Sequence, residues 1–214
     1  GVSMGIHESQ SRFYENIIGR SRAFCSVIYP WLKEHFAPRL DHVTEDDFYR
    51  MINKSEPSLI RTEADELTYC LHIMVRYELE KRMFDGSLTA HDLPAEWNRL
   101  YKEYLGIDVP DDRQGVLQDS HWANGNIGYF PSYAIGSAYG AQYLQEMSKD
   151  LDVDAVVRSG DLTPINNWLE DRIWKHGCMK DPVALFESVC GKFDPDCYVA
   201  YLEKKFTEVY GCLL

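Results

Sequence analysis

Hydrophobic side chains recur along this chain at the three- and four-residue steps of amphipathic helices. The clearest stripe lies between Pro57 and Gly86, where the spacing predicts one long helix with a buried face made of Leu67, Cys70, Leu71, Met74 and Tyr77. The first thirty-odd residues show the same mixed spacing and also predict helix. Thr44, followed by three acidic residues, predicts the capped start of a short helix.

Helix boundaries are marked most regularly in the C-terminal half. Three segments, residues 163–177, 181–191 and 194–211, each begin with a capping residue followed by proline and end at a glycine. A similar segment runs from Asp92 to Gly106. Strand signals are weak throughout, and residues 107–129 lack periodicity, which predicts a packed or functional loop. The pattern as a whole predicts an all-α fold with little or no strand.

Charge and composition exclude several classes of protein. The chain has 22 Lys and Arg residues against 34 Asp and Glu residues, a net charge of −12, which argues against a nucleic-acid partner. No run of 18 apolar residues is present, so no membrane-spanning segment is predicted. The six cysteines form no C-x-x-C pair, which predicts reduced thiols and a cytoplasmic location. Without a linker or internal repeat, residues 1–214 are expected to form a single helical portion.

The first of three polar patches contains Glu8 and Arg12 in the sequence His-Glu-Ser-Gln-Ser-Arg. Glu followed by Arg four residues later is most simply a surface ion pair on a helix, worth a few tenths of a kcal/mol. The functional alternative makes Glu8 a metal ligand, because zinc and similar cations accept a carboxylate oxygen beside imidazoles.

The second patch contains Arg61 and Asp65 at the start of the predicted long helix. The same spacing of four residues again predicts a plain helical ion pair. In the functional alternative, Asp65 fixes Arg61, and the planar guanidinium of Arg61 then binds a substrate carboxylate through two parallel hydrogen bonds.

The third patch surrounds His121, in a loop rich in glycine that also contains Tyr129 and Tyr133. A single His beside a Trp is usually a packed, hydrogen-bonded structural residue. In a loop with two phenols nearby, however, His121 has the donor types that stabilise an oxyanion.

Together the three patches resemble the zinc metallocarboxypeptidases typified by thermostable carboxypeptidase Taq. That family's pattern contains His-Glu-Ser-Gln followed by Ser-Arg, then Ile-Arg-x-x-Ala-Asp, then Gly-x-x-Gln-Asp-x-His-Trp. All three motifs occur here in that order, starting at His7, Ile60 and Gly115. The resemblance extends over essentially the whole chain and implies the C-terminal helical part of a gluzincin-like peptidase fold.

The resemblance also implies roles for individual residues. Glu8 corresponds to the third zinc ligand, and Arg61, with Asp65, corresponds to the substrate-binding position. His121 corresponds to the catalytic His of the third motif, and a downstream Tyr steadies the oxyanion, with Tyr129 as the first choice and Tyr133 as the second. The implied activity removes single amino acids from peptides with a free C-terminus, with zinc or cobalt as cofactor and a homodimer as the assembly.

One departure from the family pattern limits this inference. The family takes two imidazole ligands and a general base from His-Glu-x-x-His, and none of the seven histidines here has another His four residues later. The chain is therefore expected to be the C-terminal part of a longer enzyme. Alone, it is expected to fold, to be inactive, to bind no metal stably and to self-associate.

Two other classes remain open at this stage. The chain could be a complete, non-catalytic helical binding or scaffold module derived from a peptidase, which would require the reading frame to start near Met4. Alternatively, it could be a hydrolase without a metal, using Cys or Ser with His121. No nucleophile lies in a recognisable elbow motif, which disfavours the second class.

Overall fold

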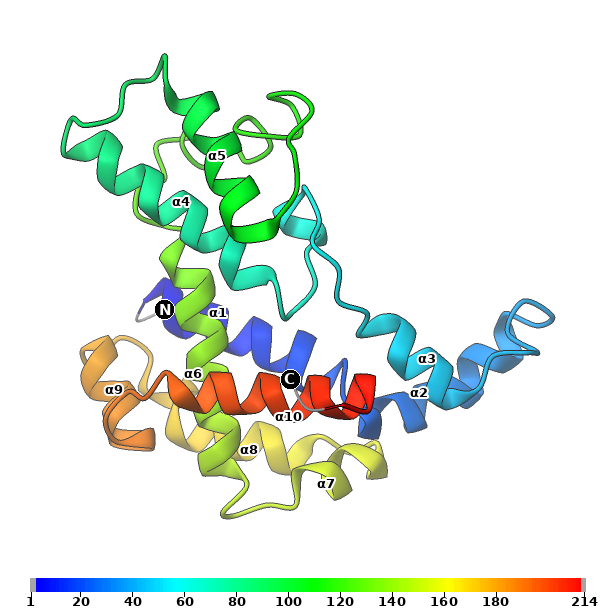
Figure 1. Cartoon of the computed structure of the whole chain (residues 1–214). Coiled ribbons are helices and arrows are strands. Elements are labelled where there is room, and N and C mark those ends of the chain that lie inside the picture. The colour runs from blue at the N-terminus through cyan, green and yellow to red at the C-terminus, as the bar shows by residue number, and fades with distance from the viewer. Residues whose placement is uncertain (1–2, 213–214) are drawn as a thin grey trace. The chain divides into compact units, whose positions relative to one another are not determined.

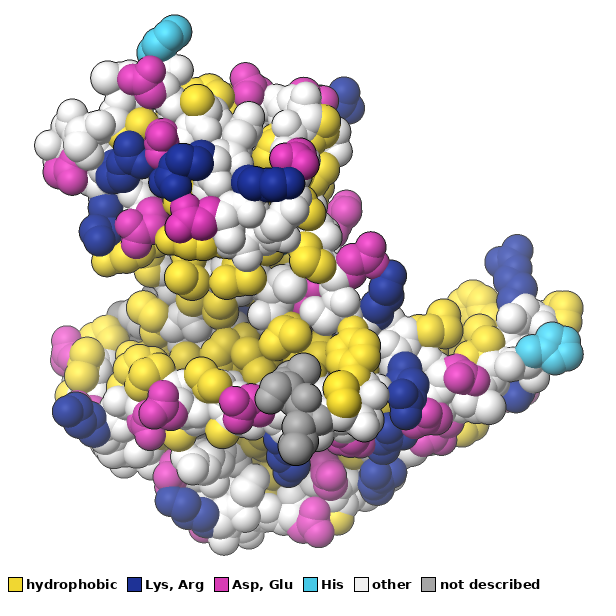
Figure 2. Space-filling view, viewed as in Figure 1, with side chains coloured by type: hydrophobic (Ala, Val, Ile, Leu, Met, Phe, Trp, Pro, Cys, Tyr) yellow, Lys and Arg dark blue, Asp and Glu magenta, His cyan; other side chains and the backbone are white. Residues whose placement is uncertain are grey.

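The computed structural model describes residues 3–212, and every regular element in that range is helical. The all-α prediction is confirmed. Contacts divide the chain into two compact units, described separately below. The smaller unit comprises Ser55–Ala134, and the larger unit comprises the described residues up to Lys54 and from Ile135 onward. On the face shown in Figure 2, acidic and basic side chains are interspersed on both units.

The larger unit contains most of the helices (Figure 1). Its first half consists of α1 (Met4–Arg12), a π-helical turn (Phe13–Ile18), α2 (Arg22–His35) and α3 (Glu45–Ile52). Its second half consists of α6 (Pro131–Met147) from Ile135 on, α7 (Val153–Ser159), α8 (Thr163–Arg172), a 3-10 turn (Trp174–His176), α9 (Pro182–Cys190) and α10 (Asp196–Tyr210). Several side chains of its core are fully buried: Phe13, Tyr143, Met147, Ile165, Leu169, Leu185 and Phe186.

The smaller unit contains a 3-10 turn (Arg61–Glu63), α4 (Tyr69–Phe84) and α5 (Leu93–Leu105), followed by a long loop. Apolar side chains of α4 and α5 form its core with Val116 from the loop: Val75, Leu79, Trp97, Leu100 and Tyr101. No helix or strand is assigned in residues 107–129, so the predicted loop is confirmed.

The helices predicted from caps and glycines are confirmed, except that α8 ends at Arg172, before the expected Gly177, and is not capped by the side chain of Thr163. α5, α8, α9 and α10 lie within the four expected segments, and the capping box at Thr44 begins α3. Gly106 and Gly211 adopt the left-handed conformation that ends α5 and α10. The sequence pattern did not identify α6 and α7. None of the helices in residues 3–212 is both long enough and apolar enough to cross a bilayer.

The predicted long helix over 57–86 is wrong in its first part. α4 begins only at Tyr69, because the Asp65 carboxylate ties the preceding segment into a turn. It accepts hydrogen bonds from the backbone N–H groups of Glu56, Leu67 and Thr68. A side chain that bonds nearby backbone donors in this way competes with helix formation.

The predicted buried face of α4 is also wrong. Met74 and Tyr77 of that stripe are each 45% exposed. The buried face instead carries His72, Arg76 and Glu80 at four-residue steps, interleaved with apolar residues. Polar side chains at buried positions need hydrogen-bond partners, and the partners of this face of α4 form the candidate site.

Candidate functional site

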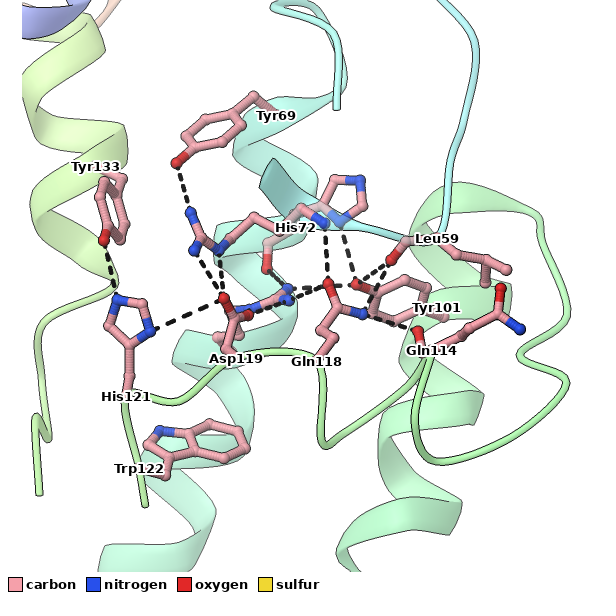
Figure 3. A network of polar contacts seen from close by, with 12 residues as sticks. Leu59, Tyr69, His72, Tyr101, Gln114, Gln118, Asp119, His121, Trp122 and Tyr133 are labelled. Carbon is pink, nitrogen blue, oxygen red and sulfur yellow. Dashed lines mark hydrogen bonds and ion pairs between the residues drawn. The ribbon is translucent and has the colours of Figure 1, made fainter. Parts of the chain in front are cut away.

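A single carboxylate, that of Asp119, holds two buried arginines in the smaller unit (Figure 3). Asp119 Oδ1 accepts from Arg61 Nε at 3.0 Å and from Arg61 Nη2 at 2.7 Å. Asp119 Oδ2 accepts from Arg76 Nε at 2.7 Å and lies 2.6 Å from Arg76 Nη2. The three side chains are at most 9% exposed. Because each arginine donates two N–H groups to the same carboxylate, both guanidinium groups are fixed in orientation.

Gln118 joins the loop to the two arginines. Its Oε1 accepts from the backbone N–H of Arg61 and from Arg76 Nη2, both at 2.9 Å. Its Nε2 donates to the carbonyl oxygens of Leu59 and Gln114. Gln118 and Asp119 of the third sequence motif are therefore the residues that attach the loop to the 3-10 turn and to α4.

His121 lies two residues beyond Asp119 and faces Tyr133 (Figure 3). Its Nε2 is 2.9 Å from the Tyr133 hydroxyl, and its Nδ1 is 3.8 Å from Asp119 Oδ1. Tyr129 is near as well, with its ring centroid 5.5 Å from that of His121. The structure thus brings together Arg61, His121, Tyr129 and Tyr133, all predicted from the sequence.

The arginines keep Asp119 ionised at pH 7, and burial favours the neutral form of His121. Burial alone would raise the pKa of Asp119, but hydrogen bonds and charges from Arg61 and Arg76 hold it below its ordinary value. Burial lowers the pKa of His121, and among the nearby charges Asp119 and Glu80 raise it while the two arginines lower it. A neutral His121 accepts a hydrogen bond from the Tyr133 hydroxyl when its own proton lies on Nδ1; when the proton lies on Nε2, His121 donates to the Tyr133 oxygen and leaves the Tyr133 O–H free to donate elsewhere.

Glu80, also on α4, fixes the far end of the loop. Its Oε1 accepts from Trp122 Nε1 at 2.7 Å and from the backbone N–H of Gly128 at 3.1 Å. Neither Arg76 nor Glu80 was predicted from the sequence. A sequence signal for them exists, because both are charged residues at positions that alternate with the buried apolar residues of α4.

The predicted ion pair between Arg61 and Asp65 is wrong. The two residues do not lie on one helix, because Arg61 is in the 3-10 turn and Ala64 is extended. Asp65 instead accepts the backbone hydrogen bonds described above, and its place beside Arg61 is taken by Asp119. Asp65 nevertheless supports the site, since it shapes the segment that carries Arg61.

Glu8 belongs to the larger unit, on α1. Its Oε2 accepts a hydrogen bond from Ser11 Oγ at 3.2 Å, and Arg12 forms an ion pair with Glu15. Helix α6 passes so close that a Cβ on Gly136 would be 2.4 Å from Glu8 Cβ. The close contact with α6 fixes the backbone of α1 at Glu8.

Within residues 3–212 the structure brings no three His, Cys, Asp or Glu side chains into an arrangement that could hold a metal ion. Three protein ligands are the usual minimum for a catalytic zinc. The described residues therefore do not make a metal site by themselves, and Glu8 could supply only one ligand.

Comparisons with known proteins agree with the motifs. The chain is 46% identical over 212 residues to carboxypeptidase 1 of Bacillus subtilis, covering 98% of this chain and 42% of that protein. It is 44% identical to thermostable carboxypeptidase 1 of Thermus thermophilus, covering 98% of this chain and 41% of that protein. The crystal structure of an M32 carboxypeptidase from Deinococcus radiodurans superposes with a TM-score of 0.95 at 40% identity, over 99% of this chain and 43% of that one.

The chain thus spans about two fifths of the length of these relatives. The sequence model of the carboxypeptidase Taq (M32) metallopeptidases matches residues 1–206, nearly the whole chain. This match and the relatives above establish that the chain belongs to the carboxypeptidase Taq (M32) family of metallopeptidases.

Proposed function

We propose that this chain supplies the substrate-binding and oxyanion-stabilising part of a metallocarboxypeptidase that removes single amino acids from the C-terminus of peptides. The observation that carries the proposal is the way Arg61 is held. A guanidinium has five N–H donors, and three of those of Arg61 are engaged, two by Asp119 and one by the Tyr69 hydroxyl. Two donors therefore remain for a ligand, on a group whose orientation is already fixed.

The ligand proposed for these two donors is the free C-terminal carboxylate of a peptide. Two arginines paired with one aspartate leave a local net charge of +1, which favours an anion. Recognition of a terminal carboxylate is what separates an exopeptidase from an endopeptidase. The carboxypeptidase relatives support this assignment.

His121 and a tyrosine are proposed to stabilise the negative charge that develops on the carbonyl oxygen of the scissile bond. The 2.9 Å contact between His121 Nε2 and the Tyr133 hydroxyl supports Tyr133 ahead of Tyr129 for this role. One well-placed donor of this kind contributes roughly 3–4 kcal/mol to stabilisation of the transition state.

Glu8 is proposed as one ligand of the catalytic metal, zinc or cobalt, with the remaining ligands outside the described residues. The family's classification as metallopeptidases supports a metal in the complete enzyme. A single carboxylate binds such a metal weakly, so the chain alone is proposed to be inactive.

The carboxylate assignment is tested by peptide binding to this chain. An N-acetylated tripeptide and its C-terminal amide are titrated into the chain and into Arg61→Lys, which keeps the charge and loses the fork. The free acid is expected to bind about tenfold more tightly than the amide, because hydrogen bonds to charged groups contribute about 1.5–3 kcal/mol. Arg61→Lys should lose this preference.

Arg99→Lys is the matched control, because Arg99 is an exposed residue of α5 in the same unit. It should retain the wild-type preference. Equal affinity of the wild-type chain for acid and amide would reject the proposed carboxylate site and favour a non-catalytic scaffold.

A further inference from the structure

We propose that Arg76 is a positioning residue of the site: its guanidinium takes one oxygen of Asp119, so that the other oxygen orients Arg61 and faces His121. None of the three motifs described above contains this residue. The link to substrate rests on the function proposed above, whereas the effect on Arg61 and His121 does not.

The surroundings of Arg76 leave it a single orientation. Its side chain is fully buried on α4, and its Nη1 donates to the carbonyl oxygen of His72 at 2.8 Å. The Trp97 ring centroid lies 4.5 Å from the guanidinium carbon, and the Phe130 centroid lies 5.3 Å from it. A cation held between backbone, side-chain acceptors and aromatic rings has little rotational freedom.

Because of Arg76, the two oxygens of the Asp119 carboxylate have different partners. Oδ2 is occupied by the Nε and Nη2 groups of Arg76, and Oδ1 is left to Arg61. The same Oδ1 atom is the one 3.8 Å from His121 Nδ1 (Figure 3). Without Arg76 the carboxylate could rotate about its Cβ–Cγ bond, so Arg61 would lose its fixed partner and Oδ1 would lose its fixed place near His121 Nδ1.

Arg76 also changes the charge of the site. Asp119 and Arg61 alone would form a neutral pair with no net attraction for an anion, and Arg76 adds the second positive charge. The charged groups acting on His121 are Asp119 and Glu80, which raise its pKa, and Arg61 and Arg76, which lower it. Tyr133 faces the other ring nitrogen. Loss of Arg76 therefore leaves His121 facing a more negative environment.

The test is NMR titration of the His121 ring in the whole chain without peptide. Arg76→Gln removes the charge, and Arg76→Lys keeps it. The His121 pKa is expected to rise by about one unit in Arg76→Gln, since one charge is lost at close range in a partly buried site. In Arg76→Lys the pKa should stay near the wild-type value.

Arg82→Gln is the control, because Arg82 lies on the same helix and pairs at the surface with Glu96. It should leave the His121 pKa unchanged. A folded Arg76→Gln variant with the wild-type His121 pKa would overturn the proposal, as would an equal rise in Arg76→Lys.

A second signal covers the case in which Arg76→Gln does not fold. The Arg61 Nε–H resonance reports the hydrogen bond to Asp119 Oδ1. In Arg76→Lys this N–H should exchange with water at least about tenfold faster than in the wild-type chain, because one ammonium cannot hold Asp119 as the fork does. An unchanged exchange rate in that variant would reject the positioning role.

These readouts separate the two proposals. If the peptide and its amide bind equally while the His121 pKa shifts as expected, the carboxylate assignment fails and the positioning role of Arg76 stands. If the chain prefers the free acid but Arg76→Gln leaves the His121 pKa unchanged, the carboxylate assignment stands and the positioning role of Arg76 fails.

Discussion

Asp119 explains why buried charge is tolerated in the smaller unit. Removing a charged group from water is unfavourable unless close partners and hydrogen bonds replace the solvent. Asp119 supplies these for Arg61 and Arg76, and Gln118 accepts from both residues as well. The two loop residues therefore make it possible for α4 to bury an arginine.

His72 is the buried residue of this network that should give the chain a measurable pH dependence. Burial, followed by the charges of Arg76 and Arg61, lowers the pKa of His72 to about 3. Its Nδ1 contacts the Tyr101 hydroxyl at 3.1 Å, and the neutral ring fits this site. The unfolded chain binds a proton at His72 below about pH 6.5, whereas the folded chain does not.

The stability contributed by a neutral His72 is therefore complete above about pH 6.5 and decreases as the pH falls toward 3. Between pH 7 and pH 5 the free energy of unfolding is expected to fall by about 2 kcal/mol because of this residue. Urea unfolding at the two pH values measures the change, and His72→Gln should remove most of it. The same pH dependence in the variant would show that His72 is not its source.

The sequence motifs located the residues of this network better than they predicted its pairings. Arg61, His121 and the tyrosines were identified from motifs, and the structure brings them together. Asp65 was paired with Arg61 from a spacing of four residues, which applies only on a helix. The actual partner, Asp119, is 58 positions away in the chain. No local pattern in the sequence indicates a contact across that separation.

At the scale of elements, α4 shows how a prediction from hydrophobic periodicity fails when the buried face of a helix is polar. Its exposed side contains a regular apolar stripe, and its buried side contains His72, Arg76 and Glu80. Periodicity selects the more apolar face as the core face. Here the choice fails because loop residues pair with Arg76 and donate hydrogen bonds to Glu80, and the periodicity of the helix contains no information on the loop.

The crossing of α1 and α6 depends on one glycine. A Cβ at Gly136 would be 2.4 Å from Glu8 Cβ and 2.8 Å from the Glu8 backbone carbon, which requires the helices to separate. A Cβ at Gly140, one turn later, would be 3.5 Å from its nearest neighbours, an ordinary contact. Of these two positions on the same helix, only Gly140 has room for a Cβ atom.

Gly136→Ala is expected to destabilise the chain by about 1–3 kcal/mol, the usual effect of overpacking. Gly140→Ala should be neutral or stabilise it by up to about 1 kcal/mol, because alanine favours helix. Urea unfolding of both variants measures the difference. Equal effects of the two substitutions would contradict the close approach of α6 to Glu8.

At the scale of the whole molecule, the regular punctuation by caps, prolines and glycines made the all-α fold predictable. The division into two units was not, because its second boundary lies within the continuous helix α6, at Ala134–Ile135. A helix that begins in one unit and ends in the other leaves no linker signal in the sequence. Self-association and the cytoplasmic location stay predictions.

The proposed place of the chain in a larger enzyme rests on two observations. It spans about two fifths of its carboxypeptidase relatives, and its described residues assemble no set of three metal ligands. The network of Arg61, Arg76 and Asp119, in contrast, lies entirely within the smaller unit. This distribution is consistent with a chain that binds the end of a peptide but does not cleave it unaided.

The most direct test joins this chain to the N-terminal three fifths of Bacillus subtilis carboxypeptidase 1, in place of the matching region, and measures zinc-dependent release of C-terminal amino acids. We predict activity in the chimera and none in the chain alone. Tyr133→Phe should lower kcat by about 100-fold, with a smaller effect of Tyr129→Phe. A folded chimera without activity, or hydrolysis by the isolated chain, would contradict the proposed function.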